Sequence, residues 1–207
     1  MDDLILANFA KHITLDPAET EYVRSLLQQK QVKKNTVLLT SGEVCRCVYF
    51  VVKGCLRLYH TDKEGKPHII SFSPENWWAV DIASFYSQTP AYYSIDALED
   101  TTVYWLRLDT LEMLYEKIPK FERFFRILTQ NGFIIYQRRM TAAQSLQAEA
   151  RYAQFQRRYP GLEQRIAQKH IASYLGITPV FLSMLRKKLL PATGLPADES
   201  NLKPGKL

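Results

Sequence analysis

The stretch QRIAQKHIASYLGITPVFLSMLRKKL, residues 164–189, decides how this chain is interpreted, because it is typical of two short helices joined by a tight turn. Gly176 lies between two runs of helical spacing, and glycine most readily takes the positive φ found at the end of a helix. The apolar positions that would face each other across the turn are Ile171, Ala172, Leu175, Leu182 and Leu185. We therefore predict a helix-turn-helix here, with an ordinary helical hairpin in a core as the alternative.

The start of the second helix is also marked in the sequence. Thr178 offers an N-cap oxygen, and Pro179 suits the first helical position. The segment IAQKHIASYLGITPVFLSMLRKKL, residues 166–189, is similar to the DNA-binding end of the Crp/Fnr regulators, the cyclic-AMP receptor protein family. The resemblance implies that side chains of the second helix contact base edges of duplex DNA.

The residues at the base-reading positions differ from those of the family. Where the family places polar and Arg side chains, this chain has Pro179, Val180 and Met184, which cannot donate to guanine. We expect weak sequence specificity, with thymine-methyl contact through Val180 and reading of DNA shape. The candidate DNA-contacting residues are Gln168, Lys169, Thr178, Val180, Phe181, Ser183, Met184, Arg186 and Lys187.

The charge of the chain is concentrated around this segment. Residues 136–190 carry 10 Lys and Arg against 2 Asp and Glu, whereas residues 1–135 carry 15 against 17. A local excess of +8 in a chain of net charge +6 indicates a polyanionic partner, here double-stranded DNA. A membrane partner is the weaker interpretation because no apolar run of about 18 residues is present.

Other classes of function find little support. The first residues, MDDLILANFAKHI, lack the pattern of a signal peptide, so we expect a cytoplasmic protein. Cys45, Cys47 and Cys55 do not complete a set of metal ligands, and we expect inert thiols and no cofactor. Neither a phosphate loop, a nucleophile elbow nor a HExxH motif occurs, so we predict that the protein is not an enzyme.

The N-terminal part is expected to form a β-barrel. Residues 2–30 show helical spacing, and from residue 31 short β-branched and aromatic runs follow between Gly, Pro or charged turns. These runs are residues 36–39, 47–52, 55–59, 68–72, 93–97 and 101–108. The pattern does not choose between a jelly roll and another barrel. Gly42-Glu43, residues 49–54 and Arg57-Leu58-Tyr59 resemble the opening strands of the family's cyclic-nucleotide-binding jelly roll, which implies that fold.

The phosphate-binding segment of the family is altered here. Val80-Asp81 stands where the family has Gly-Glu, and Ala91, Tyr92 and Tyr93 follow Pro90 without the family's Arg. We therefore expect no control by cyclic AMP or cyclic GMP, although Arg57 or Lys53 from a neighbouring strand offers a substitute cation. An aromatic pocket for another small-molecule effector is compatible with the sequence, and so is plain core packing of the same side chains. The pocket candidates are Arg57, Trp77, Trp78, Asp81, Phe85, Tyr92 and Tyr93.

A long helix is expected after the barrel. Apolar residues follow a 4, 3, 4, 3 rhythm, interrupted by Arg139, as in a two-stranded coiled coil. The residues proposed for the dimer seam are Phe121, Phe125, Leu128, Gly132 and Ile135, with the same stripe packing on its own barrel as the alternative. In the resembling family, this helix is the dimer axis.

Together these features predict an α+β protein with three parts. They are an antiparallel jelly-roll sensor domain (1–118), a dimerisation helix (119–146) and a winged helix-turn-helix domain with a loose C-terminal tail (147–207). The predicted function is a homodimeric transcriptional regulator of the Crp/Fnr type, for which the resemblance implies RNA polymerase as a further partner. The alternative function is a small-molecule or protein-interaction module whose helix-turn-helix no longer reads sequence.

Overall fold

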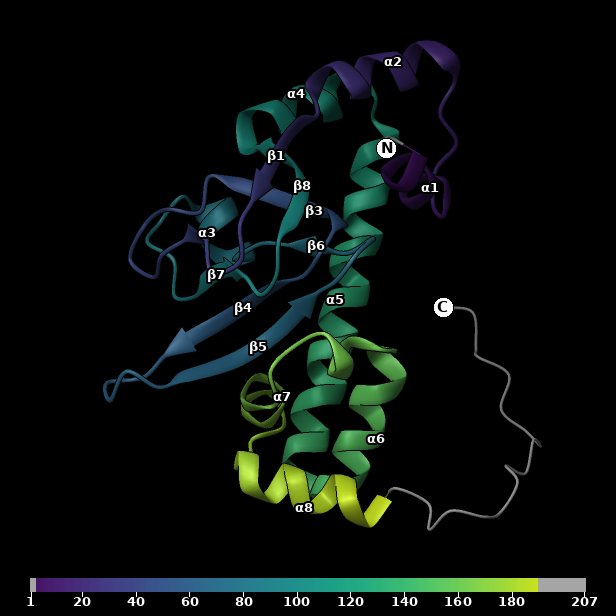
Figure 1. The fold of residues 1–207 in the computed structure, drawn as a ribbon. Helices are drawn as coiled ribbons and strands as arrows, with labels where there is room; N and C mark the ends of the chain where they lie inside the picture. The colour runs from purple at the N-terminus through teal and green to yellow at the C-terminus, as the bar shows by residue number, and fades with distance from the viewer. Residues whose placement is uncertain (1–2, 190–207) are drawn as a thin grey trace, which may run out of the picture.

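The strands form two four-stranded antiparallel sheets, shown in Figure 1, in a computed structural model that describes residues 3–189. The first sheet has the order β1 (Gln28–Val32), β8 (Thr101–Arg107), β3 (Cys47–Lys53) and β6 (Trp78–Ala79). The second has the order β2 (Val37–Leu39), β7 (Ser94–Ala97), β4 (Leu56–Thr61) and β5 (Pro67–Ser73). All pairs are antiparallel, so the sheets have the arrangement expected of a jelly roll.

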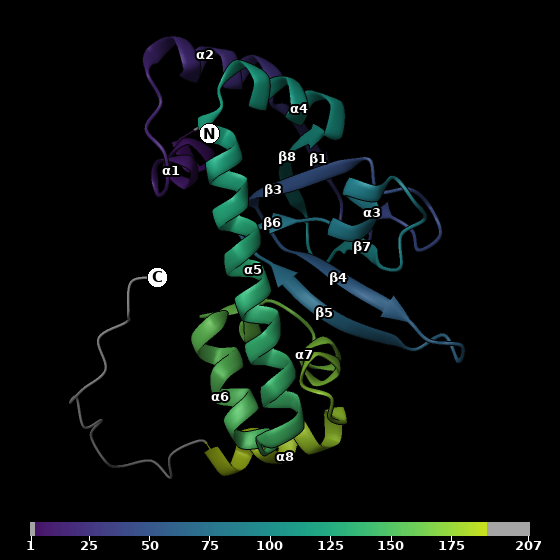
Figure 2. The same ribbon diagram turned by 180° about the vertical axis from the view of Figure 1, so that it is seen from behind.

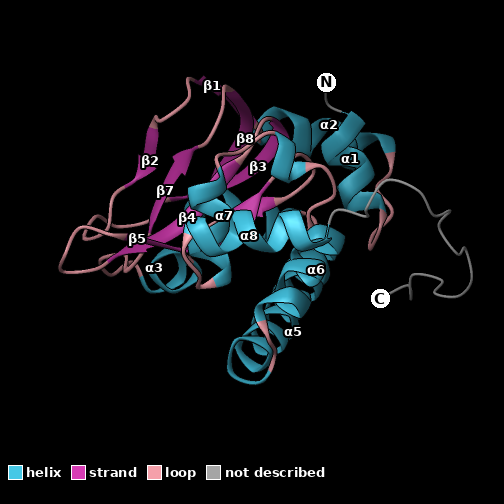
Figure 3. Cartoon of the chain, turned by 60° about the horizontal axis from the view of Figure 1, so that its bottom comes forward, coloured by secondary structure: helices cyan, strands magenta, loops and turns pink. Residues whose placement is uncertain are grey.

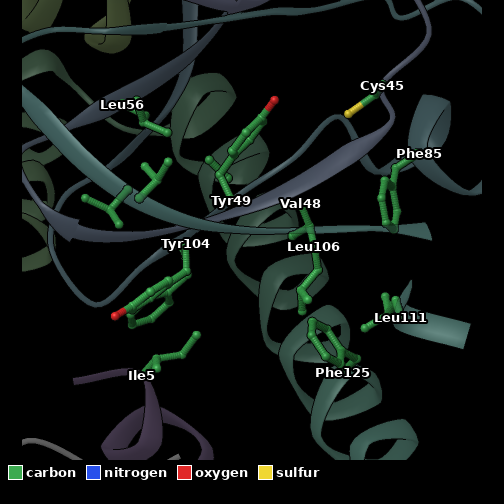
Figure 4. Close-up of a cluster of buried hydrophobic side chains, with 14 of the residues drawn as sticks. Ile5, Cys45, Val48, Tyr49, Leu56, Phe85, Tyr104, Leu106, Leu111 and Phe125 are labelled. Carbon is green, nitrogen blue, oxygen red and sulfur yellow. The ribbon is translucent and has the colours of Figure 1, made fainter. Parts of the chain in front are cut away.

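The main core lies between these sheets and the helices beside them. Figure 4 shows Val48 and Leu106 of the first sheet near Leu111 of α4 and Phe125 of α5, with Leu56 of the second sheet in the same cluster. Val48–Val51 of β3 are buried as a continuous run, and β8 buries Val103, Tyr104 and Leu106, so both faces of these strands are removed from water. This burial is the main stabilising contribution.

Most of the predicted strands are confirmed, and one prediction is wrong. The six apolar runs coincide with β2, β3, β4, β5, β7 and β8. Residues 28–30, expected to be helical, belong to β1, whose sequence QQKQV is exposed except for Val32. Because β1 is a polar edge strand that pairs only with β8, its sequence carries no alternating apolar signal, and tertiary pairing determines its structure.

Helices flank the sheets and continue to the C-terminal side. They are α1 (Asp3–Ala10), α2 (Pro17–Leu26), the short α3 (Ile82–Ser87), α4 (Leu108–Lys117), α5 (Lys120–Ser145), α6 (Ala148–Arg158), α7 (Gln168–Leu175) and α8 (Pro179–Leu189). Figure 2 shows α5 running along the molecule from α1, α2 and α4 at one end to α6, α7 and α8 at the other. The α5 helix therefore connects the two sheets to the C-terminal helices.

Two sequence predictions extend past the described part of the chain. The loose tail expected after Leu190, and any wing that follows α8, lie outside the described residues.

Between α6 and α7 the chain forms a 3₁₀ turn, η1 (Leu162–Gln164). Among the helices of residues 3–189, none combines the length and the apolar character needed to cross a membrane.

Candidate nucleic-acid interface and ligand pocket

The two short helices and the tight turn predicted for the helix-turn-helix are present as α7 and α8. Gly176 ends α7 with φ of 67°, and the Ile177 amide donates to the Ala172 carbonyl at 3.0 Å, as in a helix C-cap. The Thr178 hydroxyl accepts from the Phe181 amide at 3.1 Å and caps α8. The apolar residues of both helices that were predicted to meet, Ile171, Ala172, Leu175, Leu182 and Leu185, are all buried in one cluster.

The outward face of α8 is apolar in its first half and basic in its last turn. Val180 and Met184 are 72% and 62% exposed, and Lys187 continues the same face three residues later. Phe181 is also exposed, whereas Ser183 and Arg186 are half-buried. Figure 1 shows α8 at the lower end of the molecule, and in Figure 3, where this end comes forward, α7 lies beside it. Gln168, Lys169 and Thr178 are exposed near the ends of the two helices.

The first helix of this unit, α7, docks on β5 of the second sheet. The Ser173 hydroxyl donates to the Pro67 carbonyl at 2.7 Å and accepts from the Ile69 amide at 3.1 Å. Phe72 of β5 packs edge-on against Tyr159 at the end of α6, with ring centroids 5.5 Å apart. The C-terminal helices therefore share a buried cluster with the sensor sheet.

Arg139 of α5 joins three elements at this contact. Its guanidinium donates to the Ile69 and Tyr174 carbonyls at 2.9 Å each and to the Ile70 carbonyl, and it stacks 3.9 Å from the centre of the Tyr174 ring. The sequence showed Arg139 only as a break in the apolar rhythm of α5. That break was the available signal, because a charged residue within an apolar stripe needs partners nearby.

Two further arginines link the C-terminal part of the chain to the second sheet and to loops beside it. Arg165 donates to Glu75 at 2.7 and 2.9 Å and also pairs with Glu99. Arg57 of β4 donates to the His170 ring nitrogen Nδ1 at 3.1 Å. Burial, and next the positive charge of Arg57, lower the pKa of His170 to about 4. His170 is therefore neutral at neutral pH and can accept this hydrogen bond from Arg57.

The altered phosphate-binding segment is closed by its own carboxylate. Asp81, 2% exposed, caps α3 by accepting from the Ser84 amide at 3.2 Å. Its second oxygen accepts from the Tyr92 and Tyr93 amides at 3.1 Å each. Backbone donors at a helix N-terminus are the groups that would receive an anion. In this chain the Asp81 side chain already accepts from the Ser84, Tyr92 and Tyr93 amides, so these donors are not free for a ligand.

Arg57, the substitute guanidinium suggested by the sequence, is not available to this segment. It makes a bidentate pair with Asp96 of β7, with N–O distances of 2.6 and 2.7 Å, and both side chains are largely buried. With Nη1 on His170, each of the three guanidinium nitrogens of Arg57 has a partner. Moving Arg57 into a ligand pocket would break this buried pair and leave an unpaired charge, so the structure gives that prediction no support.

The structure divides the predicted pocket residues into two groups. Trp77, Trp78 and Phe85 line a cavity of about 550 Å³ between the sensor sheet, α5 and the end of α6. Tyr92 and Tyr93 lie elsewhere, and Tyr92 stacks on His60 at the surface, with ring centroids 4.3 Å apart. Trp78 also packs against the core rings of Phe9, Phe50, Phe124 and Phe125, so it serves as a wall of both core and cavity.

The stripe proposed as a dimer seam is only partly free. Phe121 and Phe125 are 0% and 6% exposed within the core of their own sensor domain, so their assignment to the seam is wrong. Leu128, Gly132 and Ile135 are half-buried beside the cavity. The apolar residues that α5 does expose are Phe133, Ile134, Tyr136 and Met140. The heptad rhythm did not distinguish these faces, because a helix packed on a sheet repeats with nearly the same period.

The cysteines form no cluster with other ligands. Among residues 3–189, no group of His, Cys, Asp and Glu is arranged to hold a metal ion. Burial raises the pKa of the Cys55 thiol to about 12, so this side chain stays protonated.

Comparison with known proteins agrees with this architecture. Residues 29–117 match the family model described as cyclic nucleotide-binding domain. No curated protein matches the chain. Among solved structures, FixK2 from Bradyrhizobium japonicum is similar with a TM-score of 0.70, at 20% identity over 79% of this chain and 84% of that one. A putative transcriptional regulator of the Crp/Fnr family from Eubacterium rectale gives 0.65, at 18% identity over 84% and 83%.

A third similar structure is the catabolite activator protein of Thermus thermophilus, with a TM-score of 0.55 at 18% identity over 84% of both chains. Residues 29–117 thus match the cyclic nucleotide-binding domain and have its jelly-roll fold, and the chain is similar in structure to Crp/Fnr-type regulators. The α+β fold predicted from the sequence is confirmed.

Proposed function

We propose that the protein is a dimeric DNA-binding transcriptional regulator of the Crp/Fnr type. The observation that carries the proposal is α8, which is capped at its start and lies at one end of the molecule (Figure 1). Its outward face, with Val180, Met184 and Lys187, is exposed. Recognition helices of this kind place their N-terminal residues against base edges, while basic residues nearby hold phosphates. The net charge of +8 over residues 136–190 supports the same partner.

Fluorescence anisotropy with a labelled random duplex at low salt tests the proposal. Lys187→Ala is expected to weaken binding, because it removes an exposed cation on the outward face of α8. Lys117→Ala is the matched control, since this exposed lysine of α4 lies at the opposite end of the molecule. Absence of duplex binding by the wild type, or equal loss in both variants, would contradict the proposed interface.

The exposed apolar side chains of α8 predict that the protein reads thymine methyl groups. Val180, Phe181 and Met184 offer methyl and ring surface but no hydrogen-bond donor to a base. In a duplex selected for tight binding, replacing contacted thymines by uracil removes only the C5 methyl. Affinity is expected to fall about fourfold for each buried methyl, from about 0.8 kcal/mol per methylene-sized group.

Val180→Ala should remove this sensitivity to uracil at the thymine it contacts, because the replaced side chain no longer reaches the methyl. Equal affinity of the wild type for the thymine and uracil duplexes would exclude methyl reading, while leaving DNA binding itself intact.

Control by cyclic AMP or cyclic GMP is not expected. The amides of Ser84, Tyr92 and Tyr93 are engaged by Asp81, and Arg57 is paired with Asp96. Each missing hydrogen bond to a charged phosphate costs about 1.5–3 kcal/mol, so a micromolar site would weaken by one to two orders of magnitude per bond. Isothermal titration calorimetry should show no saturation by either nucleotide below about 0.1 mM. Saturable micromolar binding would contradict this prediction and would show that the phosphate replaces Asp81 as the acceptor for these amides.

A homodimer through α5 is part of the proposal. The helix spans Lys120–Ser145 and exposes Phe133, Ile134, Tyr136 and Met140, side chains that a partner helix would remove from water. Gly132 has no heavy atom within 4 Å of where a Cβ would lie, so close approach of a second backbone is sterically open there.

A further inference from the structure

We propose that the cavity beside α5 binds an amphipathic monocarboxylate, a molecule with an apolar body and one carboxylate. The inference rests on the proposed function only in treating this ligand as an effector; binding itself is independent of DNA. The site is distinct in chemistry from a cyclic-nucleotide cassette, because its anion-binding group is Arg158 of α6 and not the segment closed by Asp81.

The cavity has the size and the apolar wall of a small-molecule site. Its volume of about 550 Å³ lies within the range of about 300–1,000 Å³ that is usual for such pockets. Trp77 and Trp78 come from the sensor sheet side, Leu128 and Ile135 from α5, and Tyr159 from the end of α6. The apolar body of a bound molecule would therefore contact apolar and aromatic side chains, and both surfaces would be removed from water.

The charges around the cavity select an anion. Its wall includes Lys11, Arg139 and Arg158, and no Asp or Glu contributes to it. Arg139 is already engaged with three carbonyl groups. Lys11 is exposed on the loop after α1. Arg158 is therefore the cation best placed to receive a ligand inside the cavity.

Arg158 is oriented but not neutralised. Its guanidinium lies 4.6 Å from the centre of the Trp77 ring and 5.5 Å from that of Tyr159, and its Nε donates to the Tyr159 hydroxyl at a long 3.4 Å. Within residues 3–189, no carboxylate forms an ion pair with it. Stacking on the Trp77 face leaves the edge of the guanidinium for an acceptor, and a carboxylate fits that edge with two hydrogen bonds.

The position of the site gives the ligand a regulatory role. The cavity wall includes Phe72 of β5, Ile135 of α5, and Tyr159 and Tyr174 of the C-terminal helices. A molecule in the cavity would contact all of these elements at once, so its binding energy favours the arrangement in which they meet. The ligand would thus stabilise the docked position of α7 and α8 on the sensor sheet.

Isothermal titration calorimetry with decanoate tests the site in the full chain. The wild type is expected to bind decanoate saturably below the millimolar range. Arg158→Leu should weaken this binding about 10- to 150-fold, the range expected for loss of a hydrogen bond to a charged group. The affinity of Arg158→Lys for decanoate should lie between those of the wild type and Arg158→Leu, because lysine keeps the charge and loses the bidentate geometry.

Arg157→Leu is the matched control, since the neighbouring arginine is exposed and absent from the cavity wall. It should bind decanoate as the wild type does. Decanol should bind the wild type and Arg158→Leu equally, and thermal melting of both variants reports whether they fold. No saturable heat with decanoate, or equal binding by Arg158→Leu and the wild type, overturns the proposal. Anisotropy with duplex DNA on the same samples reports separately on the proposed function.

Discussion

Raising monovalent salt from about 50 to about 200 mM is expected to weaken duplex binding about 10³-fold, if a dimer neutralises about six phosphates. Three cations from each protomer account for that number: Lys169 at the start of α7, and Arg186 and Lys187 in the last turn of α8. Each phosphate contact releases condensed counterions, which gives a slope of about −0.9 in a plot of log K against log salt. Anisotropy titrations at four or five salt concentrations measure the slope.

Lys187→Ala should make this slope shallower by about two in a symmetric dimer, one for each protomer. Lys117→Ala, at the far end of the molecule, should leave it unchanged. A slope near zero for the wild type would remove DNA as the principal partner. A steep slope that Lys187→Ala does not alter would place the phosphates elsewhere on the surface.

Loss of the buried ion pair in the second sheet is the other large effect that we expect. Asp96→Asn should lower the free energy of unfolding by about 3–5 kcal/mol, because it leaves the Arg57 charge without compensation in a largely buried position. The substitution retains the size of the side chain, so the loss reports on charge. Chemical denaturation followed by tryptophan fluorescence measures the change.

Two further variants distinguish this cause from general damage to the sheet. Arg57→Met combined with Asp96→Leu removes both charges and should recover most of the stability, since apolar replacements of buried pairs are often neutral or better. Asp100→Asn alters an exposed carboxylate paired with Lys33 and should have a far smaller effect, because solvent screens that pair. If the double variant were less stable than Asp96→Asn, packing or the contact with His170 would be the dominant contribution.

The features that the sequence predicted well depend on residues close together in the chain. The turn at Gly176, the cap at Thr178 and the facing leucines of α7 and α8 are fixed by local spacing, and all are present in the structure.

The features that it missed depend on partners far away in the chain. Asp81 was recognised only as a departure from a motif, and nothing local showed that its carboxylate would receive the amides of Tyr92 and Tyr93. The pairing of Arg57 with both Asp96 and His170 joins residues from three elements. Such contacts are set by the tertiary fold, and no periodicity in the chain reports them.

The dimer stripe shows where a correct pattern led to a wrong assignment. The rhythm through Phe121 and Phe125 is real, but these side chains fill the core beside β3 and β8. Only the part of α5 beyond the sensor domain leaves apolar side chains exposed, among them Phe133 and Met140. The position of the first sheet therefore determines which apolar residues of α5 are buried within the protomer and which stay exposed.

The anchoring of Arg139 to β5 and to α7 has a consequence for geometry in the proposed dimer. The Arg139 guanidinium of α5 binds carbonyl groups of both β5 and α7. These three elements would therefore move together as one rigid body in each protomer. The separation of the two α8 helices would then depend on one variable, the angle at which the paired α5 helices cross. Adjacent major grooves on one side of DNA are about 34–36 Å apart. A change in the crossing angle of the α5 helices would therefore determine whether both α8 helices can bind their half-sites at the same time.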